Sequence, residues 1–334
     1  MIRRTGTLLV FCLSSVVLMS SCGCGNSSNA LSEPNRGSQT EFERIVTTCG
    51  MVTDIVEIVV GSERYEVVGL MGAGVDPHLY KPTSNDVRQL LRADVVVYSG
   101  LMLEGKMSTT FEKISKTGKA VFAVTDGIDR KYLREPPEFE GHFDPHVWMD
   151  VSAWMRGVEF VAASMGEIDP PNAETYLANA TAYCKKLEEL DAYARESIAS
   201  IPAEQRILVT AHDAFGYFAR AYDIEVRSVQ GLSTDSEAAV KDINNLVDLI
   251  VERKITAIFI ESSVSAKNIE AIIEGANTRG WSVEIGGVLF SDAMGKPGTY
   301  EGTYIGMIDH NVTCITRALG GTASAGGMQA RLGQ

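Results

Sequence analysis

Two of the five histidines in this 334-residue chain lie in the same tripeptide, Asp-Pro-His, which occurs as Asp76–His78 and again as Asp144–His146. Proline fixes its own φ angle and pushes the aspartate before it into an extended conformation, so each histidine ends a stiff turn. An imidazole held in this way is well suited to bind a metal ion. The alternative interpretation is that the two tripeptides form ordinary solvent-exposed turns.

Two further residues could complete a metal site. His212, in ILVTAHDAFGYF, lies at the carboxyl end of a predicted strand, which is where ligands bind in open α/β sheets. Asp292, in GVLFSDAMG, follows the last predicted strand. If the two halves of the chain face each other, these residues and the two repeated histidines could meet in one cleft. Three imidazoles and one carboxylate suit a first-row transition metal. Taken singly, each residue could instead have a structural role, as a hydrogen-bonded histidine or a loop cap.

Four acidic residues lie close to the candidate ligands in the sequence: Asp76, Asp144, Asp213 and Glu261. We hypothesise that some of them hydrogen-bond to the imidazoles and orient them. The two aspartates of the repeated tripeptides could instead only cap their turns. The remaining histidines, His142 and His310, are predicted to take no part in the site.

Short β-rich runs alternate with helical segments from Ile45 onward. Strands are predicted at Ile45–Thr48, Tyr65–Leu70, Val95–Tyr98 and Ala120–Val124, and helices near Val52–Val60, Asn85–Leu91 and Phe111–Lys116. This alternation predicts βα units, in which helices cover both faces of a parallel sheet. His78 then follows the second strand, and His146 follows the fourth, at the start of a helix through Trp148–Met165.

Residues 172–201 are predicted to form one long helix. Apolar residues recur at helical spacing from Leu177 to Ile198, and prolines stand at both ends. At 1.5 Å per residue, the helix would span about 45 Å. It is too long for a simple crossover between neighbouring strands, so we expect it to join two halves.

The alternation restarts after this helix. Strands are predicted at Ile207–Thr210, Ile224–Val229, Ala257–Ile260 and Ser282–Ile285, and helices near Ala214–Ala221, Ser236–Arg253, Ala266–Arg279 and Thr303–Leu319. Thr234 and Glu237 have the spacing of a capping box for the second of these helices. The fold class predicted is therefore α/β, with two domains of four βα units around one long helix.

The ends of the chain are predicted to lie outside this fold. Residues 1–22 have a basic start, an apolar run at Leu8–Met19 and then Ser20-Ser21-Cys22. This pattern resembles a bacterial lipoprotein signal with a lipid on Cys22, and Cys24 is a second candidate. An ordinary secretory signal is the alternative, and both imply export. Residues 23–43 are predicted to form a flexible tether, and residues 320–334 a disordered tail.

Composition excludes some functions. The net charge of −13 argues against nucleic-acid binding, which needs a basic surface. Apart from the signal region, the cysteines are Cys49, Cys184 and Cys314. They are odd in number, and their spacing fits neither a disulfide framework nor a zinc finger. We expect all three to be small buried apolar residues.

From about Ile45 to Leu319 the chain resembles the metal-binding receptors of bacterial ABC importers, of the TroA type. The resemblance rests on the stretches GLMGAGVDPHLY, DPHVWMD, LVTAHDAFGYF, AIFIESSV and LFSDAMG. It implies two four-stranded domains (44–168 and 203–319) joined by one rigid helix (169–202). It also implies that the metal is held by His78, His146, His212 and Asp292.

This resemblance implies a biological role as well. A monomeric, lipid-anchored receptor on the periplasmic or extracytoplasmic side would deliver its metal to a membrane permease driven by a cytoplasmic ATPase. Many manganese receptors of this type have glutamate at the position of His212, so the third imidazole here favours Zn²⁺ over Mn²⁺ in intrinsic affinity. Mn²⁺, Zn²⁺ and Fe²⁺ all stay as candidates. The alternative functions are a surface adhesin and, more remotely, a zinc hydrolase.

Overall fold

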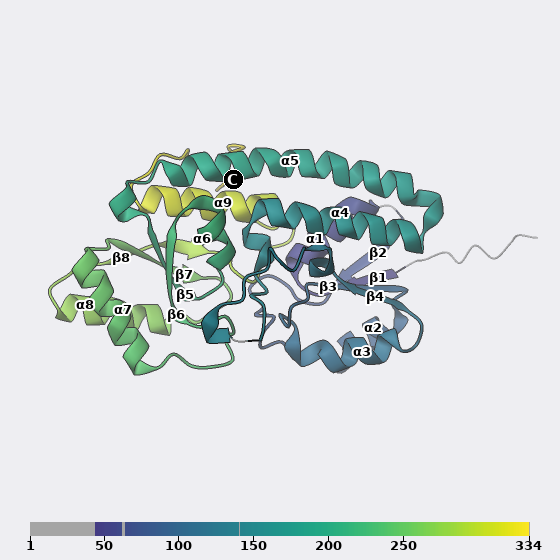
Figure 1. Cartoon of the computed structure of the whole chain (residues 1–334), viewed down its shortest axis with the longest axis horizontal. Coiled ribbons are helices and arrows are strands. Elements are labelled where there is room, and N and C mark those ends of the chain that lie inside the picture. The colour runs from purple at the N-terminus through teal and green to yellow at the C-terminus, as the bar shows by residue number, and fades with distance from the viewer. Residues whose placement is uncertain (1–43, 62–63, 140, 334) are drawn as a thin grey trace, which may run out of the picture. The chain divides into compact units, whose positions relative to one another are not determined.

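Four parallel strands form the sheet of the first half, in the order β2-β1-β3-β4. The computed structural model describes residues 44–61, 64–139 and 141–333 (Figure 1). The strands are short and rich in β-branched residues, which fit a buried, pleated surface. They are β1 (Arg44–Thr47), β2 (Glu66–Gly69), β3 (Val95–Tyr98) and β4 (Ala120–Ala123), and the helices of this half are α1 (Gly50–Val60), α2 (Ser84–Arg92) and α3 (Ser108–Ser115).

Local side-chain caps start two of the helices in the first half. In α2, the hydroxyl of Thr83 accepts from the backbone N–H of Asp86, and the Asp86 carboxylate accepts from the backbone N–H of Thr83. This reciprocal pair satisfies two donors that a helix N-terminus leaves free. The carboxylate of Asp150 caps the next helix, α4 (Val151–Ile168), at the backbone N–H groups of Ser152 and Ala153. Because α4 starts directly after the second Asp-Pro-His tripeptide, this cap helps to fix where that turn ends.

The long helix α5 (Ala173–Ala199) joins the two halves. Its 27 residues span about 40 Å, slightly less than the predicted 172–201 range. It packs against α1 and α4 near its start and against α6 (Gly216–Tyr222) and α9 (Tyr304–Ala318) near its end (Figure 1). A helix with this many partners along its length has little freedom to bend.

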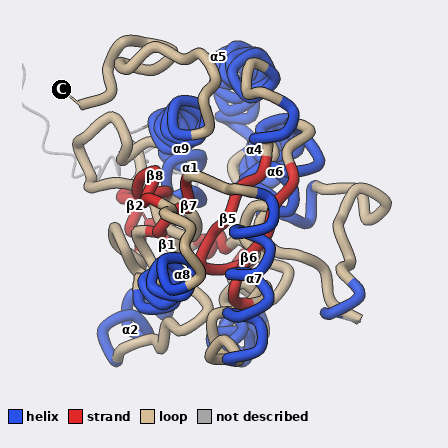
Figure 2. The backbone as a smooth tube through the Cα atoms, turned by 90° about the vertical axis from the view of Figure 1, so that its left-hand side faces the viewer, coloured by secondary structure: helices blue, strands red, loops and turns tan. Residues whose placement is uncertain are grey.

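The second half contains two pairs of parallel strands. β5 (Ile207–His212) pairs with β6 (Glu225–Gln230), and β7 (Ala257–Glu261) pairs with β8 (Glu284–Leu289). β5 and β7 lie next to each other, which places the carboxyl ends of both pairs together. Helices α7 (Val240–Arg253) and α8 (Lys267–Thr278) complete this half, and Figure 2 shows the strands among the surrounding helices.

Six short 3₁₀ helices connect these elements: η1 (Gly105–Met107), η2 (Val124–Gly127), η3 (Pro137–Phe139), η4 (Val147–Met149), η5 (Pro170–Asn172) and η6 (Ala203–Gln205) within the described residues.

One hydrophobic core extends through both halves. It contains Val96 of β3, Leu187 of α5 and Phe259 of β7, together with the fully buried Trp148 and Tyr304. A second, smaller core lies between β5, β7, α7 and α8. Because the larger core is continuous through α5 and α9, the two halves are packed together rather than merely tethered.

Two elements of the second half differ from the sequence-based prediction. β8 runs to Leu289, not Ile285, so Asp292 follows the strand closely. Helix α7 starts at Val240, after Ala239, which has no side-chain cap. The predicted capping box of Thr234 and Glu237 is therefore wrong. The hydroxyl of Thr234 instead donates to Asp76 of the first half.

The tail after Leu319 was also predicted wrongly. In residues 320–333, the backbone N–H of Met328 donates to the buried carboxylate of Asp309, and Arg331 lies over the ring of Tyr300. The reason is that Asp309 needs donors inside the protein, and the tail supplies one. Of the three cysteines, Cys49 is buried, whereas Cys184 and Cys314 are only partly so. The predicted signal, the lipidation site Cys22 and the tether lie outside the described residues.

We expect the Asp54→Asn substitution to remove one source of pH-dependent stability. Burial raises the pKa of Asp54 on α1 from 3.8 to about 6, although the hydroxyl of Tyr183 donates to its Oδ2 atom at 2.9 Å. A carboxyl whose pKa is raised by folding stabilises the fold while protonated, and this contribution is lost as pH rises from about 4 to about 6. The loss amounts to about 3 kcal/mol at most.

Urea unfolding of the metal-free protein across this pH range would measure the effect. The wild type should lose stability relative to Asp54→Asn as pH rises. Asp242→Asn, which removes an exposed carboxylate of α7, serves as the matched control and should follow the wild type. Parallel stability curves for the wild type and Asp54→Asn would contradict the prediction.

Candidate metal centre

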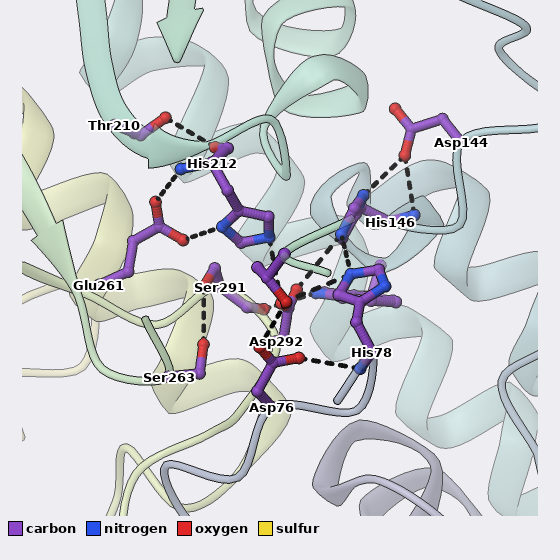
Figure 3. A network of polar contacts seen from close by, with 12 residues as sticks. Asp76, His78, Asp144, His146, Thr210, His212, Glu261, Ser263, Ser291 and Asp292 are labelled. Carbon is purple, nitrogen blue, oxygen red and sulfur yellow. Dashed lines mark hydrogen bonds and ion pairs between the residues drawn. The ribbon is translucent and has the colours of Figure 1, made fainter. Parts of the chain in front are cut away.

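The turn that carries His78 follows β2. The Oδ1 atom of Asp76 accepts a hydrogen bond from the backbone N–H of His78 at 2.8 Å, as expected of an aspartate that caps its own turn. The Nε2 atom of His78 points toward His146, and the two Nε2 atoms are 3.3 Å apart (Figure 3). Asp76 therefore acts on the backbone of His78, not on its ring.

His146, in the second tripeptide, is held at two points by Asp144. The Oδ1 atom of Asp144 accepts from the backbone N–H of His146 at 2.9 Å and lies 2.8 Å from the ring atom Nδ1. The other carboxylate oxygen binds the guanidinium of Arg134. With Nδ1 occupied, the ring of His146 presents Nε2 to the centre of the cluster, and both side chains are fully buried.

His212 is the last residue of β5, and Glu261 is the last residue of the neighbouring β7. The Oε1 atom of Glu261 accepts from the backbone N–H groups of Ala211 and His212, at 2.8 and 2.9 Å. Its Oε2 atom lies 2.5 Å from Nδ1 of His212. One carboxylate thus holds both the strand end and the imidazole, and Nε2 of His212 is left to face the cluster.

Asp292 brings a carboxylate to these three rings. It is fully buried, and its oxygens lie 3.1 Å from Nε2 of His212, 3.3 Å from Nε2 of His146 and 3.7 Å from Nε2 of His78. One potential ligand atom from each of the four residues lies within 4.8 Å of the others (Figure 3). The structure therefore brings together the four residues singled out in the sequence.

Electrostatics differ between the two histidines of the first half. Burial lowers the pKa of His78 to about 4, and the charge of Asp292 only partly offsets this effect. Burial also pushes the pKa of His146 down. In that case, however, the contacts with Asp144 and Asp292 outweigh burial and raise the pKa to about 9. His78 is therefore neutral at pH 7, and His146 is protonated when no metal is bound.

The residues of the second half form a tightly coupled pair of opposite charges. Burial lowers the pKa of His212, but the charges of Glu261 and Asp292 outweigh it and hold that pKa well above its ordinary value. Burial raises the pKa of Asp292, but His212 and His146 outweigh it and hold that pKa well below its ordinary value. Without metal, the cluster is thus an anionic carboxylate compensated by protons on imidazoles.

The hydrogen bonding of the cluster is incomplete. Among the described residues, several of its buried atoms have no hydrogen-bond partner of acceptable geometry: both ring nitrogens of His212, Oε2 of Glu261 and both carboxylate oxygens of Asp292. Buried polar atoms are rarely left in this state, because the cost is about 1–3 kcal/mol for each. A divalent cation bound by three nitrogens and one oxygen would compensate Nε2 of His212 and the carboxylate of Asp292, whereas Nδ1 of His212 and Oε2 of Glu261 face each other.

The other polar residues named from the sequence lie apart from this cluster. His142 is exposed and packs on Phe139, whereas the Nε2 atom of His310 binds the backbone oxygen of Val288. Both ring nitrogens of His212 face Glu261 and Asp292, so Asp213 acts on this imidazole only through its charge, and its orienting role stays a hypothesis.

Sequence reasoning missed two residues that support the site. Arg134 shares the carboxylate of Asp144, and the indole N–H of Trp148 donates to the backbone oxygen of Ser291, beside Asp292. No sequence pattern marks Arg134, because its partner is chosen by the fold. For Trp148, the only signal in the sequence is its position two residues after His146.

Comparison with known proteins agrees with this description. The family model described as zinc-uptake complex component A, periplasmic, matches residues 45–318. The manganese-binding lipoprotein MntA of Bacillus subtilis is 44% identical over 298 residues, which cover 89% of this chain and 94% of the relative. The zinc-binding protein TroA of Treponema pallidum is 47% identical over 275 residues, which cover 82% of this chain and 88% of the relative.

The solved structure of periplasmic TroA from Treponema pallidum also matches, with a TM-score of 0.80 and 46% identity, over 83% of this chain and 99% of that one. It confirms the predicted α/β class and two-domain arrangement, and the resemblance on which they partly rested. The chain therefore belongs to the family of zinc-uptake complex component A, whose members are solute-binding receptors of ABC metal importers and not enzymes.

Proposed function

We propose that this chain is an extracytoplasmic receptor that binds one divalent transition-metal ion as cargo and delivers it to an ABC permease. The ligands would be Nε2 of His78, His146 and His212 and a carboxylate oxygen of Asp292. The halves 44–168 and 203–319 would supply two ligands each, with the helical region 169–202 as a rigid connection.

The observation that carries this proposal is the geometry of the four side chains. Potential ligand atoms from residues far apart in the sequence lie within 4.8 Å of one another, in a region that water barely reaches. Asp144 and Glu261 hold Nδ1 of two of the imidazoles, so that Nε2 faces inward. Metal-binding histidines are usually held in this way by a carboxylate or a carbonyl group.

The chemistry of the donors supports a first-row metal as cargo. Zn²⁺ accepts three imidazoles and a carboxylate in tetrahedral geometry, and intrinsic affinity should favour it over Mn²⁺. One of the two relatives is named manganese-binding and the other zinc-binding, which supports both ions as candidates. We propose Zn²⁺ or Mn²⁺ as the cargo, with Fe²⁺ as a third candidate when availability rather than affinity decides.

The cellular arrangement proposed here extends what the family shares. The relative from Bacillus subtilis is named a lipoprotein, and we propose that this chain is likewise exported and anchored by a lipid on Cys22. Among the described residues, none of the helices combines the length and apolar character needed to cross a bilayer. The receptor would act as a monomer and dock on a permease driven by a cytoplasmic ATPase. Neither a surface adhesin nor a zinc hydrolase gains support from the described residues.

We expect the metal-free protein to bind one equivalent of Zn²⁺ or Mn²⁺ tightly and His212→Ala to lose this binding. Isothermal titration of both proteins would measure the stoichiometry. His310→Ala is a matched control, because it removes an imidazole from the same half without touching the cluster. The absence of a tight equivalent in the wild type, or binding that survives in His212→Ala, would refute the proposed site.

A second expectation concerns Glu261. Its replacement by glutamine keeps the size of the side chain but weakens the hold on Nδ1 of His212, so metal affinity should fall about 10- to 100-fold. A competition titration against a chelator of known affinity would measure this change. Glu274→Gln is the control, since it makes the same chemical change at an exposed residue of α8 in the same half. Equal affinities for wild type and Glu261→Gln would show that the carboxylate only supports the backbone.

Metal affinity should rise with pH. The metal-free site holds protons on His146, whose pKa is about 9, and on His212, whose pKa is higher than usual, and a metal must displace them. Affinity should therefore drop up to about 100-fold for each unit of pH below about 9, because two protons compete. Chelator competition at several pH values would test this slope, and an affinity independent of pH would contradict it.

A further inference from the structure

The cluster of candidate ligands is almost sealed. His146, His212 and Asp292 are fully buried, and only 6% of the surface of His78 is exposed. A cavity of about 390 Å³ lies against His78, and both halves of the protein form its walls. An ion that leaves the cluster must displace part of the protein, and this cavity is an open space that His78 itself lines.

The wall from the first half is firmly held. Leu101 and Met102 follow Gly100 in an unusual left-handed turn, with φ angles of 52° and 68°. The buried carboxylate of Glu104 accepts hydrogen bonds from the backbone N–H groups of Ser99 and Gly100. Charge-assisted bonds of this kind are strong, so this wall is not the part expected to move.

The wall from the second half is a loop, residues 231–239, between β6 and α7. The loop is closed at its base by a hydrogen bond from Nε2 of Gln230 to the backbone oxygen of Ser236, 2.9 Å long. At its start, Gly231 has open space where a side chain would stand. The tip of the 231–239 loop, around Thr234 and Asp235, can therefore move about this base, whereas Leu232 is buried and Ala238 packs against the smaller core.

Two contacts hold this loop against the first half. Nζ of Lys106 lies 2.6 Å from Oδ1 of Asp235, and the hydroxyl of Thr234 donates to Oδ2 of Asp76 at 2.5 Å. The other oxygen of Asp76 is the one that binds the backbone N–H of His78. Asp76 thus connects the 231–239 loop directly to the turn that presents a candidate ligand.

We propose that the 231–239 loop is the gate on the path of the metal, latched by Thr234 and Asp235, and that the closed latch fixes His78 in its binding position. This inference rests on the proposed metal-receptor function and names the residues that set how fast the ion is captured and released. Thr234, Asp235 and Lys106 are positioning residues, since they act on the ligand through Asp76 and the loop.

The latch formed by the Thr234–Asp76 and Lys106–Asp235 contacts should control the rates of metal capture and release. It should not change the number of ions bound. Both contacts are partly exposed, and each such pair contributes weakly, so the loop opens often. Loss of both should accelerate metal release about three- to tenfold. The affinity should fall by no more than the same factor, because the four ligands stay in place.

Release of Zn²⁺ from the full-length protein to excess chelator, followed by stopped flow, tests the gate. The key variant combines Thr234→Val with Lys106→Met. Lys116→Met is the matched control, because it removes the same charge from an exposed pair with Glu112 on α3. Lys106→Glu alone places two carboxylates together and should also accelerate release. Adding Asp235→Lys restores the attraction in reverse and should return the release rate to that of the wild type, because Thr234 is kept in both variants.

Three outcomes decide the question once circular dichroism and thermal unfolding show that the variants are folded. Faster release in the double variant, with one equivalent still bound and recovery in the exchanged pair, supports the gate. Release at the wild-type rate, or equal acceleration by Lys116→Met, overturns the gate alone. If the wild type binds none of Zn²⁺, Mn²⁺ and Fe²⁺, the proposed function falls and the gate with it.

Discussion

A buried carboxylate shared by three imidazoles is the constraint on which this structure depends. Asp292 is removed from water, and none of its contacts with the Nε2 atoms of the histidines is a well-formed hydrogen bond. Because a buried charge without compensation costs several kcal/mol, the cluster must hold positive charge in some form. Protons on His146 and His212 can supply it, and so can a divalent cation. The same arrangement therefore explains both the raised imidazole pKa values and the suitability of the site for a metal.

The position of Asp292 depends in turn on the packing between the halves. The indole N–H of Trp148, from the first half, binds the backbone oxygen of Ser291, and the hydroxyl of Tyr304 binds the backbone oxygen of Trp148. These bonds lie in the core that α5 and α9 share with the strands of both halves. A large rotation of one half against the other would break them and open that core. A small loop at the mouth of the cleft can move at far lower cost, which is why the 231–239 loop is the natural place for motion.

The two carboxylates that hold imidazoles work in different ways. Asp144 divides its oxygens between His146 and the guanidinium of Arg134, so its charge is partly compensated. Glu261 uses one oxygen on two backbone N–H groups and the other on His212. Because the guanidinium of Arg134 offsets part of its charge, Asp144 stabilises a proton on the ring of His146 less than an unpaired carboxylate would. Two buried imidazoles that each meet a carboxylate through Nδ1 thus become two electrostatically different ligands.

Local rules of sequence determined much of this protein. The stiff Asp-Pro-His turns, the alternation of strands and helices, the long apolar helix and the placement of His212 at a strand end follow from short-range geometry, and the four candidate ligands could be named from them. Tertiary structure alone decided the partners of Thr234, Arg134 and Asp309. Thr234 looked like a helix cap but binds Asp76, and the tail looked disordered but satisfies Asp309. Such contacts join residues far apart in the chain. Their energy depends on which side chains the fold brings together, and no local sequence pattern encodes that choice.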